Sequence, residues 1–409
     1  MPKSPSASYV RIVKVTARAA KRLHAGHPWV YSSDLPEKDA DSIPAAALVH
    51  VADERGRFLG SALSSSASQI ALRLLSHKEK LEEKQLSALI RERMAAALSY
   101  RQRVVRDSDA YRVVFSEADA LPGVIVDRYH DVLTIQMLTQ AMDRDDLRAA
   151  VLQALVSAFG SGVSIVERAE ARIRELEKLP PMENRLLAGE KSMTQFTMNG
   201  LRFHFDAMGG QKSGAFLDQR ENYAAAALYG FGDALDVFTY HGGFALHLAR
   251  VCKSVTGVDA SRPALEQAEA NAKDQANASQ FQCGEIEWLE ANAFDLLKDF
   301  ASTGKQYDTI VLDPPAFAKS KRTLETALRG YKELNLRALK MLRPGGVLIT
   351  CSCSHHVSED DFLEMLASAA NDAGRTVRML EKRGQSKDHP MVLNIPETAY
   401  LKCIIGTVE

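Results

Sequence analysis

From residue 210 onward, apolar segments with strand character alternate with predicted helices, and this alternation restricts the fold more than any other feature of the chain. Such a pattern is typical of a doubly wound parallel sheet. Strands are predicted at Ala234 to Phe238, Ser254 to Val258, Ile286 to Leu289, Thr309 to Leu312 and Gly346 to Thr350. Because ligands of such sheets bind at the carboxyl ends of the strands, polar residues at those ends are candidates for a functional site.

The chain before this region predicts two further units. Residues 9 to about 76 contain one helical piece, Ala17 to Leu23, and short strands at 9–15, 48–51, 58–63 and 69–75, which predict a small β-barrel. Residues 78–106 predict one long amphipathic helix. An α+β module follows, with strands at 111–115, 124–127, 132–138 and 163–166, a helix at 144–159 and a hairpin at 194–205. Domains are expected at 1–76, 77–190 and 191–409.

Composition limits the classes of protein to which the chain can belong. Its 409 residues, 46% hydrophobic and 25% charged, predict a soluble protein of two or three domains. No apolar run approaches the ~20 residues of a membrane span, and the N-terminus lacks the apolar core of a signal peptide. Five cysteines without framework spacing favour free thiols in the cytoplasm. No Cys/His cluster has zinc-site spacing, so no metal is expected. Because no apolar run is long enough to span a membrane, no membrane partner is expected either.

The net charge of −1 conceals a basic N-terminus. Before Asp34 the chain has no acidic residue, and it carries Lys3, Arg11, Lys14, Arg18, Lys21 and Arg22. Such a segment is suited to follow a line of phosphates. We interpret Lys21 and Arg22 as candidate nucleic-acid contacts; the alternative is a solvated basic face.

Residues 235–244 have the pattern of a strand, a glycine turn and a helix start, and Asp259 ends the next predicted strand. In nucleotide-binding α/β units, glycines such as Gly242 and Gly243 let the backbone approach the ligand, and the second acid binds ribose hydroxyls. The Asp236 carboxylate would repel a pyrophosphate and suits a cationic ligand with an amino group. This favours S-adenosylmethionine over NAD, with capping of the turn as the alternative role for Asp236. The predicted cofactor contacts also include Tyr240, Ala260, Asp313 and Asn292, whose amide oxygen can accept from the adenine amino group.

Two later strands end in a carboxylate and a thiol. The run from Asp313 through Pro314, Pro315 and Ala316 to Phe317 is similar to the motif used by methyltransferases of exocyclic amines and of ring carbons, so it leaves N-methylation open. The prolines fix φ and hold the loop open, and the aromatic ring is expected to stack on the base. Cys353 favours cytosine, because C5 becomes nucleophilic only after a thiolate adds at C6. That thiol needs surroundings that lower its pKa or remove its proton; a small buried cysteine is the structural alternative.

Residues 345–354, with Glu359 beyond them, resemble the Gly-Gly…Thr-Cys-Ser…Glu motif of RNA cytosine-5 methyltransferases, and the resemblance aligns Cys353, not Cys351, with their nucleophile. Nearly the whole chain resembles the PUA-domain-containing class I methyltransferases that make 5-methylcytidine in large-subunit ribosomal RNA. The matching runs are 21–31 (KRLHAGHPWVY), 117–129 (EADALPGVIVDRY) and 210–220 (GQKSGAFLDQR).

This resemblance implies a PUA-like RNA-binding domain, a linker helix with a central α+β domain, and a Rossmann-like class I methyltransferase core. It implies cofactor contacts at Ser213, Phe216 and Arg220. Implied substrate contacts are Pro314, Pro315, Phe317 and Lys319. The chain departs from the family pattern at Asn292, where an acid is usual, and at Cys351, which adds a thiol. Ala316 stands where RNA cytosine-5 methyltransferases hold a second cysteine that assists release.

We therefore expect a cytoplasmic S-adenosylmethionine-dependent methyltransferase that forms 5-methylcytidine in 23S ribosomal RNA, with Cys353 as nucleophile and Asp313 hydrogen-bonded to the cytosine. A guanine N-methyltransferase on the same scaffold is the first alternative. A non-catalytic RNA-binding ribosome-assembly factor is the second. The sequence leaves a homodimer open.

Overall fold

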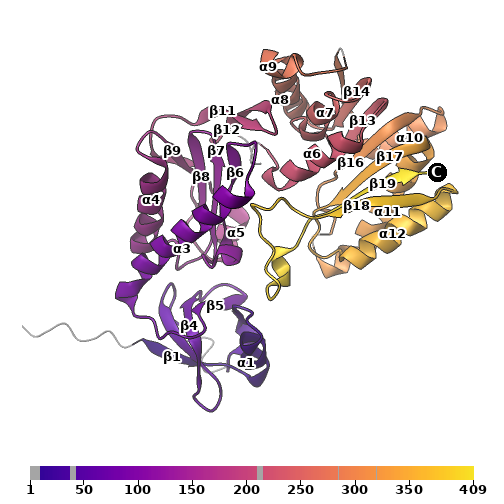
Figure 1. The fold of residues 1–409 in the computed structure, drawn as a ribbon. Helices are drawn as coiled ribbons and strands as arrows, with labels where there is room; N and C mark the ends of the chain where they lie inside the picture. The colour runs from indigo at the N-terminus through magenta and orange to yellow at the C-terminus, as the bar shows by residue number, and fades with distance from the viewer. Residues whose placement is uncertain (1–9, 37–42, 210–214, 284, 319) are drawn as a thin grey trace, which may run out of the picture.

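The structure is a computed structural model that describes residues 10–36, 43–209, 215–283, 285–318 and 320–409. Three units follow one another along the chain. In Figure 1 the N-terminal unit lies below the central one, and the C-terminal α/β unit lies beside it. Tyr9, Ser213 and Lys319 are outside the described residues.

The N-terminal unit is a five-stranded sheet with the strand order β1-β3-β4-β5-β2. Its strands are β1 (Arg11–Lys14), β2 (Trp29–Tyr31), β3 (Leu48–Ala52), β4 (Phe58–Ser64) and β5 (Ile70–Ser76), with helix α1 (Ala17–His24) and the 3-10 turn η1 (Ser32–Asp34). Thr16 caps α1 by accepting from the Ala19 amide. Strand β2 was not predicted, because three residues are too few to establish a period.

The central unit packs one long helix on a second five-stranded sheet, ordered β10-β9-β8-β7-β6. The helix α3 (Glu83–Val104) begins later than predicted, at a capping box in which the Gln85 side chain accepts from the Glu82 amide. The other elements are β6 (Ala110–Phe115), η2 (Ser116–Asp119), β7 (Val124–Tyr129), β8 (Val132–Met137), α4 (Asp145–Phe159), β9 (Ser164–Glu167), α5 (Ala171–Leu176) and β10 (Arg185–Ala188).

An antiparallel hairpin, β11 (Met193–Met198) with β12 (Leu201–Asp206), leads into the C-terminal unit, as predicted. There a seven-stranded sheet has the order β15-β14-β13-β16-β17-β19-β18. Its strands are β13 (Asp233–Val237), β14 (Ser254–Asp259), β15 (Ile286–Glu290), β16 (Tyr307–Leu312), β17 (Leu342–Ser352), β18 (Val377–Arg383) and β19 (Lys402–Val408). The first five are parallel, which confirms the predicted doubly wound core. Strand β19 runs antiparallel to β17 and β18, and this pair was not predicted.

Helices cover both faces of the seven-stranded sheet, and each face has its own buried apolar cluster. The helices and turns are η3 (Leu217–Gln219), α6 (Arg220–Tyr229), α7 (Gly243–Leu248), α8 (Arg262–Lys273), α9 (Gln275–Ala278), α10 (Ala293–Ser302), η4 (Lys321–Thr323), α11 (Leu324–Met341), α12 (Glu359–Ala373) and η5 (Pro396–Thr398). This layering places the ends of β13, β16 and β17 at one edge.

Between β18 and β19 the chain leaves the sheet as a long connection, residues 384–401, which we term the crossover segment. It is the yellow loop that reaches the other two units in Figure 1. The Asn394 amide donates to the carbonyl of Gly26 over 3.0 Å, and Glu397 lies 3.1 Å from the His27 ring nitrogen Nε2. Arg101 of α3 donates to the carbonyl of Asp388 over 2.8 Å. The crossover segment therefore contacts all three units.

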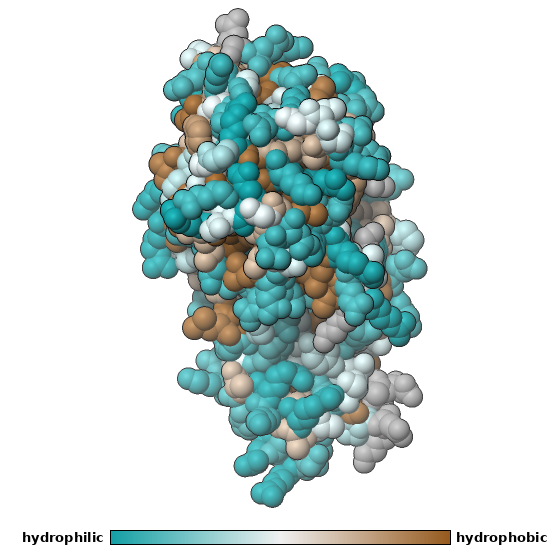
Figure 2. All heavy atoms as spheres, turned by 90° about the vertical axis from the view of Figure 1, so that its right-hand side faces the viewer, coloured by the Kyte–Doolittle hydropathy of each residue, from teal (hydrophilic) through white to brown (hydrophobic). Residues whose placement is uncertain are grey.

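Polar side chains cover most of the face shown in Figure 2, with apolar ones in small groups between them. Within the described ranges, no helix has the length and apolarity needed to cross a bilayer.

Candidate active site

The loop between β13 and α7 has an uncommon backbone. Phe238 and Tyr240 have φ values of 68° and 51°, in the left-handed region that non-glycine residues rarely occupy, and Gly242 has φ 84°. Such strain is concentrated at functional sites. A Cβ atom on Gly243 would lie 2.5 Å from the Tyr223 ring. The absence of a side chain therefore lets Tyr223, which lines the pocket, pack against the backbone, in addition to the predicted approach of a ligand.

Asp236, near the end of β13, is buried and supports this loop. Its Oδ2 accepts from the Thr239 hydroxyl over 2.5 Å and from the Ala245 amide over 2.9 Å. The other oxygen, Oδ1, is buried without a partner among the described residues. Burial raises the pKa of Asp236 to about 7, and the nearby Asp259 adds to the rise. The predicted capping role is therefore present, together with an unused acceptor.

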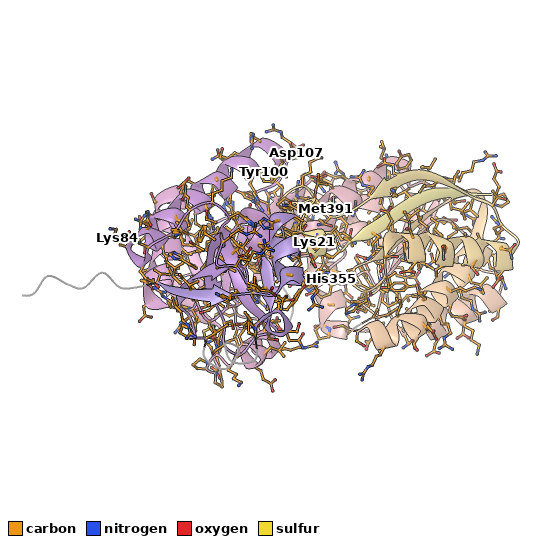
Figure 3. The ribbon with its side chains drawn as sticks, turned by 90° about the horizontal axis from the view of Figure 1, so that it is seen from below. Lys21, Lys84, Tyr100, Asp107, His355 and Met391 are labelled. Carbon is orange, nitrogen blue, oxygen red and sulfur yellow. The ribbon has the colours of Figure 1, made fainter. Side chains whose placement is uncertain are left out.

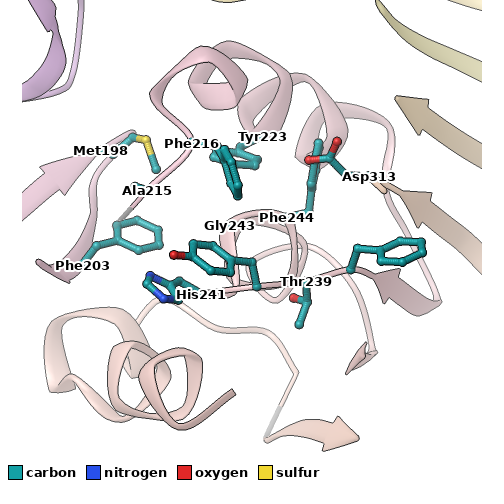
Figure 4. Close-up of a pocket in the computed structure, with 12 residues that line it drawn as sticks. Met198, Phe203, Ala215, Phe216, Tyr223, Thr239, His241, Gly243, Phe244 and Asp313 are labelled. Atoms are coloured by element: carbon teal, nitrogen blue, oxygen red, sulfur yellow. The ribbon is translucent and has the colours of Figure 1, made fainter. Parts of the chain in front are cut away.

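A pocket lies over the loop. Figure 4 shows Met198 and Phe203 of the hairpin on one side, with Phe216, Tyr223 and Asp313 around the same hollow. The complete lining is Met198, Phe203, Ala215, Phe216, Tyr223, Phe238, Thr239, Tyr240, His241, Gly243, Phe244 and Asp313. Its aromatic rings provide flat apolar surfaces, and the stacked pair of Tyr240 and His241 has ring centroids 3.7 Å apart.

Four of the predicted cofactor residues line this pocket: Phe216, Tyr240, Gly243 and Asp313. The others that the structure describes, Arg220, Asp236, Gly242, Asp259, Ala260 and Asn292, lie outside its lining. Asp259 accepts from the amides of Tyr240 and Ser261, over 3.0 and 2.9 Å, and so orients the loop. Asn292 uses its amide oxygen to cap α10, accepting from Phe294 over 2.9 Å, so this oxygen is already engaged. Ala260 is exposed.

Asp313 follows β16 and reaches the pocket. Its Oδ1 accepts from the Gln219 amide over 2.9 Å. Burial raises the pKa of Asp313 to about 8, and the carboxylates of Asp218 and Asp236 raise it further. At neutral pH the side chain therefore carries a proton in the free protein.

Cys353 follows the last residue of β17 and is partly exposed, whereas Cys351 is fully buried. The Cys353 sulfur lies 3.9 Å from the carbonyl oxygen of Pro314, so the thiol adjoins the loop that follows Asp313. Burial raises the pKa of Cys353 to about 12, with Asp313 and Asp218 acting in the same direction. The described surroundings thus oppose ionisation, contrary to the requirement for a lowered pKa.

Two predicted arginine contacts form ion pairs within the fold. Arg220 is buried, donates to Asp388 over 2.9 Å and does not line the pocket. Arg22 is ion-paired with the buried Asp34 and donates to the carbonyl of Trp29 over 3.1 Å. The absence of acidic residues before Asp34 could not reveal that the Asp34 side chain pairs with Arg22.

Three of the remaining predicted substrate residues belong to the loop that follows Asp313, and one lies on α1. Pro314 is buried and Pro315 is exposed. Phe317 packs on Tyr331, with ring centroids 4.7 Å apart, so at least part of its ring is committed to the core. Lys21 of α1 is exposed.

Sequence reasoning missed several pocket residues. Met198 and Phe203 belong to a predicted hairpin, but nothing in its alternation indicates which unit it contacts. Tyr223 lies one turn into α6, and its only signal is proximity to the 210–220 run.

The donor set fits S-adenosylmethionine. The partnerless Asp236 oxygen provides a buried acceptor for the amino group of a cationic ligand, and such a ligand would favour the ionised form of this carboxyl group. The aromatic lining suits an adenine ring. Among the described residues, no group of three or more His, Cys, Asp or Glu side chains is arranged to hold a metal ion.

Comparison with known proteins agrees with this geometry. Residues 13–77 match the family described as PUA-like domain, and residues 140–404 match S-adenosylmethionine-dependent methyltransferase. The crystal structure of SMU.776 with SAH superposes with a TM-score of 0.81 at 18% identity, covering 97% of this chain and all of that one, which supports the fold. Fold and site therefore define an S-adenosylmethionine-dependent methyltransferase with an N-terminal PUA-like domain.

Curated relatives narrow the assignment. Proteins named ribosomal RNA large subunit methyltransferase I are 34% identical in Pseudoalteromonas translucida and 36% identical in Shewanella amazonensis. Each alignment covers 97% of this chain and 99% of the relative. The chain belongs to the methyltransferase family that contains these proteins, and its cofactor is S-adenosylmethionine.

Proposed function

We propose that this methyltransferase forms 5-methylcytidine in large-subunit ribosomal RNA, through a transient bond between the Cys353 sulfur and C6 of the target cytosine. The names of the relatives support ribosomal RNA as the substrate. The observation that carries the chemistry is the partly exposed Cys353 thiol, 3.9 Å from the Pro314 carbonyl, beside the carboxyl group of the Asp313 motif. The exposed Lys21 and the PUA-like domain would bind the RNA backbone.

S-adenosylmethionine supplies, when bound, a methyl group made electrophilic by its positive sulfur. Asp313 is protonated at neutral pH and can donate a hydrogen bond to N3 of the cytosine. This draws electrons from C6, where the Cys353 thiolate adds, and C5 gains the electron pair that accepts the methyl group. Loss of the C5 proton to a base and cleavage of the sulfur–C6 bond then restore the aromatic ring and the thiolate. A target within a helix must first leave its stack, at a cost of a few kcal/mol.

The test uses Cys353→Ala, with Cys351→Ala, two residues earlier and within β17, as the matched control. Ribosomal RNA from a deletion strain is methylated in vitro, and 5-methylcytidine is measured by mass spectrometry. We expect loss of product with Cys353→Ala and retention with Cys351→Ala. Wild-type protein, but not Cys353→Ala, should form a covalent complex with RNA containing 5-fluorocytidine. Full activity of Cys353→Ala, or a methylated guanine as the product, would refute the proposal.

A further inference from the structure

Lys402, the first residue of β19, is a buried cation whose role the proposed chemistry does not yet include. Only 8% of the residue is exposed. Its Nζ donates to the carbonyl of Ser354 over 2.7 Å and to that of Tyr400 over 2.9 Å. No carboxylate in the described part of the chain lies within ion-pair distance of this nitrogen. Burial of an ammonium group without a counter-ion is costly. A neutral side chain would fill the same space at lower cost.

The position of Lys402 explains why a charge is useful there. Lys402 pairs with Ser352 across β17 and β19, and Cys353 is the next residue. The Ser354 carbonyl that Lys402 binds belongs to the residue after Cys353. Lys402 thus holds the two-residue turn that carries the thiol and brings a positive charge to its side.

Several charged groups act on this thiol. Asp313 at the end of β16 and Asp218 before α6 oppose its ionisation, and Lys402 favours it. The hydroxyls of Tyr331 in α11 and Tyr400 also interact with it. Glu359 of α12 and the thiol itself in turn favour the charged form of Lys402, whose pKa burial lowers to about 8. At neutral pH Lys402 is therefore still mainly protonated, and it is the one cation in this set.

We propose that Lys402 is a positioning residue that fixes the turn bearing Cys353 and stabilises its thiolate. The inference rests on the proposed role of Cys353 and deepens it. The thiol proton leaves to solvent, and the thiolate and the Lys402 ammonium each favour the charged form of the other. The sulfur can then form its bond to C6 without transferring a proton to Lys402.

The experiment measures alkylation of Cys353 by iodoacetamide as a function of pH, without RNA, in full-length protein. Peptide mass spectrometry separates Cys353 from the other four cysteines, all of which are buried. Lys402→Met, similar in shape but neutral, should slow alkylation at pH 7.5 about tenfold or more, because Lys402 is mainly protonated at this pH. Lys340→Met, at an exposed lysine of α11, is the control and should match wild type. An unchanged rate of alkylation at pH 7.5 in Lys402→Met would overturn the proposal.

Lys402→Arg keeps the experiment decisive if the neutral variant does not fold. A guanidinium cannot lose its proton in the range where Lys402 does, so Cys353 should ionise at a lower pH than in wild type. A midpoint equal to or above the wild-type value would contradict the proposal. The outcome is also separable from that of the proposed function. Normal methylation by Cys353→Ala with a shifted Lys402→Met profile refutes the adduct only, and the reverse pair of results refutes only the role of Lys402.

Discussion

Asp236 and Asp313 are acids whose pKa values are raised in the folded protein. They lie at the ends of the adjacent strands β13 and β16, and the pKa values of their carboxyl groups rise to about 7 and about 8. Burial is the main cause in both cases, and charge repulsion among the strand-end acids adds to it. A bound cation would favour the ionised form of Asp236, so binding of S-adenosylmethionine should release protons near neutral pH.

Substitution of Asp236 by Asn tests this account. A carboxyl group whose pKa rises on folding contributes stability below its unfolded pKa, near 4, and this contribution is lost as pH rises toward 7. The wild-type free energy of unfolding should therefore fall by roughly 2 to 3 kcal/mol more between pH 5 and 8 than that of Asp236→Asn. Urea denaturation across this range measures the difference. Parallel pH profiles of the two proteins would show that Asp236 ionises normally.

The same substitution should weaken cofactor binding. Asn retains one oxygen for Thr239 and Ala245 but presents no negative charge to an amino group. Isothermal titration with S-adenosylmethionine should give a dissociation constant about tenfold or more above wild type, and proton release should decrease. Unchanged affinity for S-adenosylmethionine would mean that Asp236 only supports the loop between β13 and α7 and does not contribute to cofactor binding.

At the residue scale, the sequence identified Asp236, Asp313 and Cys353 because strand ends and short motifs are local. It could not identify the direction of the Cys353 pKa shift or the proximity of Lys402. The first depends on burial and on Asp313 and Asp218, which are brought together only in the folded chain, and the second on a strand that pairs with β17 only in three dimensions.

At the scale of elements, the five parallel strands were predictable because each is a buried apolar run closed by a turn. Strand β18 is mostly exposed and lacks that signal. Strand β19 is apolar, but its sequence does not indicate that it inserts antiparallel between β17 and β18. The same limit applies to the crossover segment, which sequence reasoning did not separate from the methyltransferase core.

Asp388 is the residue through which the crossover segment is most firmly anchored. It is fully buried, accepts from Arg220 and from the Arg112 amide over 2.9 Å each, and its carbonyl binds Arg101. Although burial opposes its ionisation, His389 and Arg220 hold the pKa of Asp388 well below its usual value.

Asp388→Ala leaves Arg220 buried without its partner and should cost about 3 to 5 kcal/mol of unfolding free energy at pH 7. Glu364→Ala, at an exposed position of α12, should stay within about 0.5 kcal/mol of wild type. Denaturant titration followed by circular dichroism measures both. Because the ion pair requires an ionised Asp388, the difference between wild type and Asp388→Ala should shrink as pH falls below about 4. Equal stability of the two variants would mean that the anchor is dispensable.

At the scale of the whole molecule, the crossover segment connects the PUA-like domain to the turn bearing Cys353. Asn394 and Glu397 contact the end of α1, and Tyr400 and Lys402 lie at the candidate active site. Figure 3 labels Lys21 of α1, Met391 of the crossover segment and His355, two residues after Cys353. The His355 ring lies 5.3 Å from that of Tyr400. RNA held by α1 would therefore lie at the start of a continuous path to the Cys353 thiol.

Lys21→Ala should weaken binding of ribosomal RNA and reduce the slope of log affinity against log salt by about one. Lys84→Ala is the control, because Lys84 is exposed on α3 and lies far from Lys21 in Figure 3. Fluorescence titrations at several salt concentrations measure both, and affinity for S-adenosylmethionine should be unchanged in each. If the two variants weaken RNA binding equally, the α1 surface is not the RNA contact.

The placement of β19 affects how the protein can be made. Strand β17 obtains its second hydrogen-bonding neighbour only from a strand translated after it, once the crossover segment has been synthesised. Until β19 leaves the ribosome, the nascent chain exposes the unpaired edge of a highly apolar strand, a template for aggregation. The rate of translation and the supply of chaperones should thus affect the yield of soluble protein more than the folding of the N-terminal domains does.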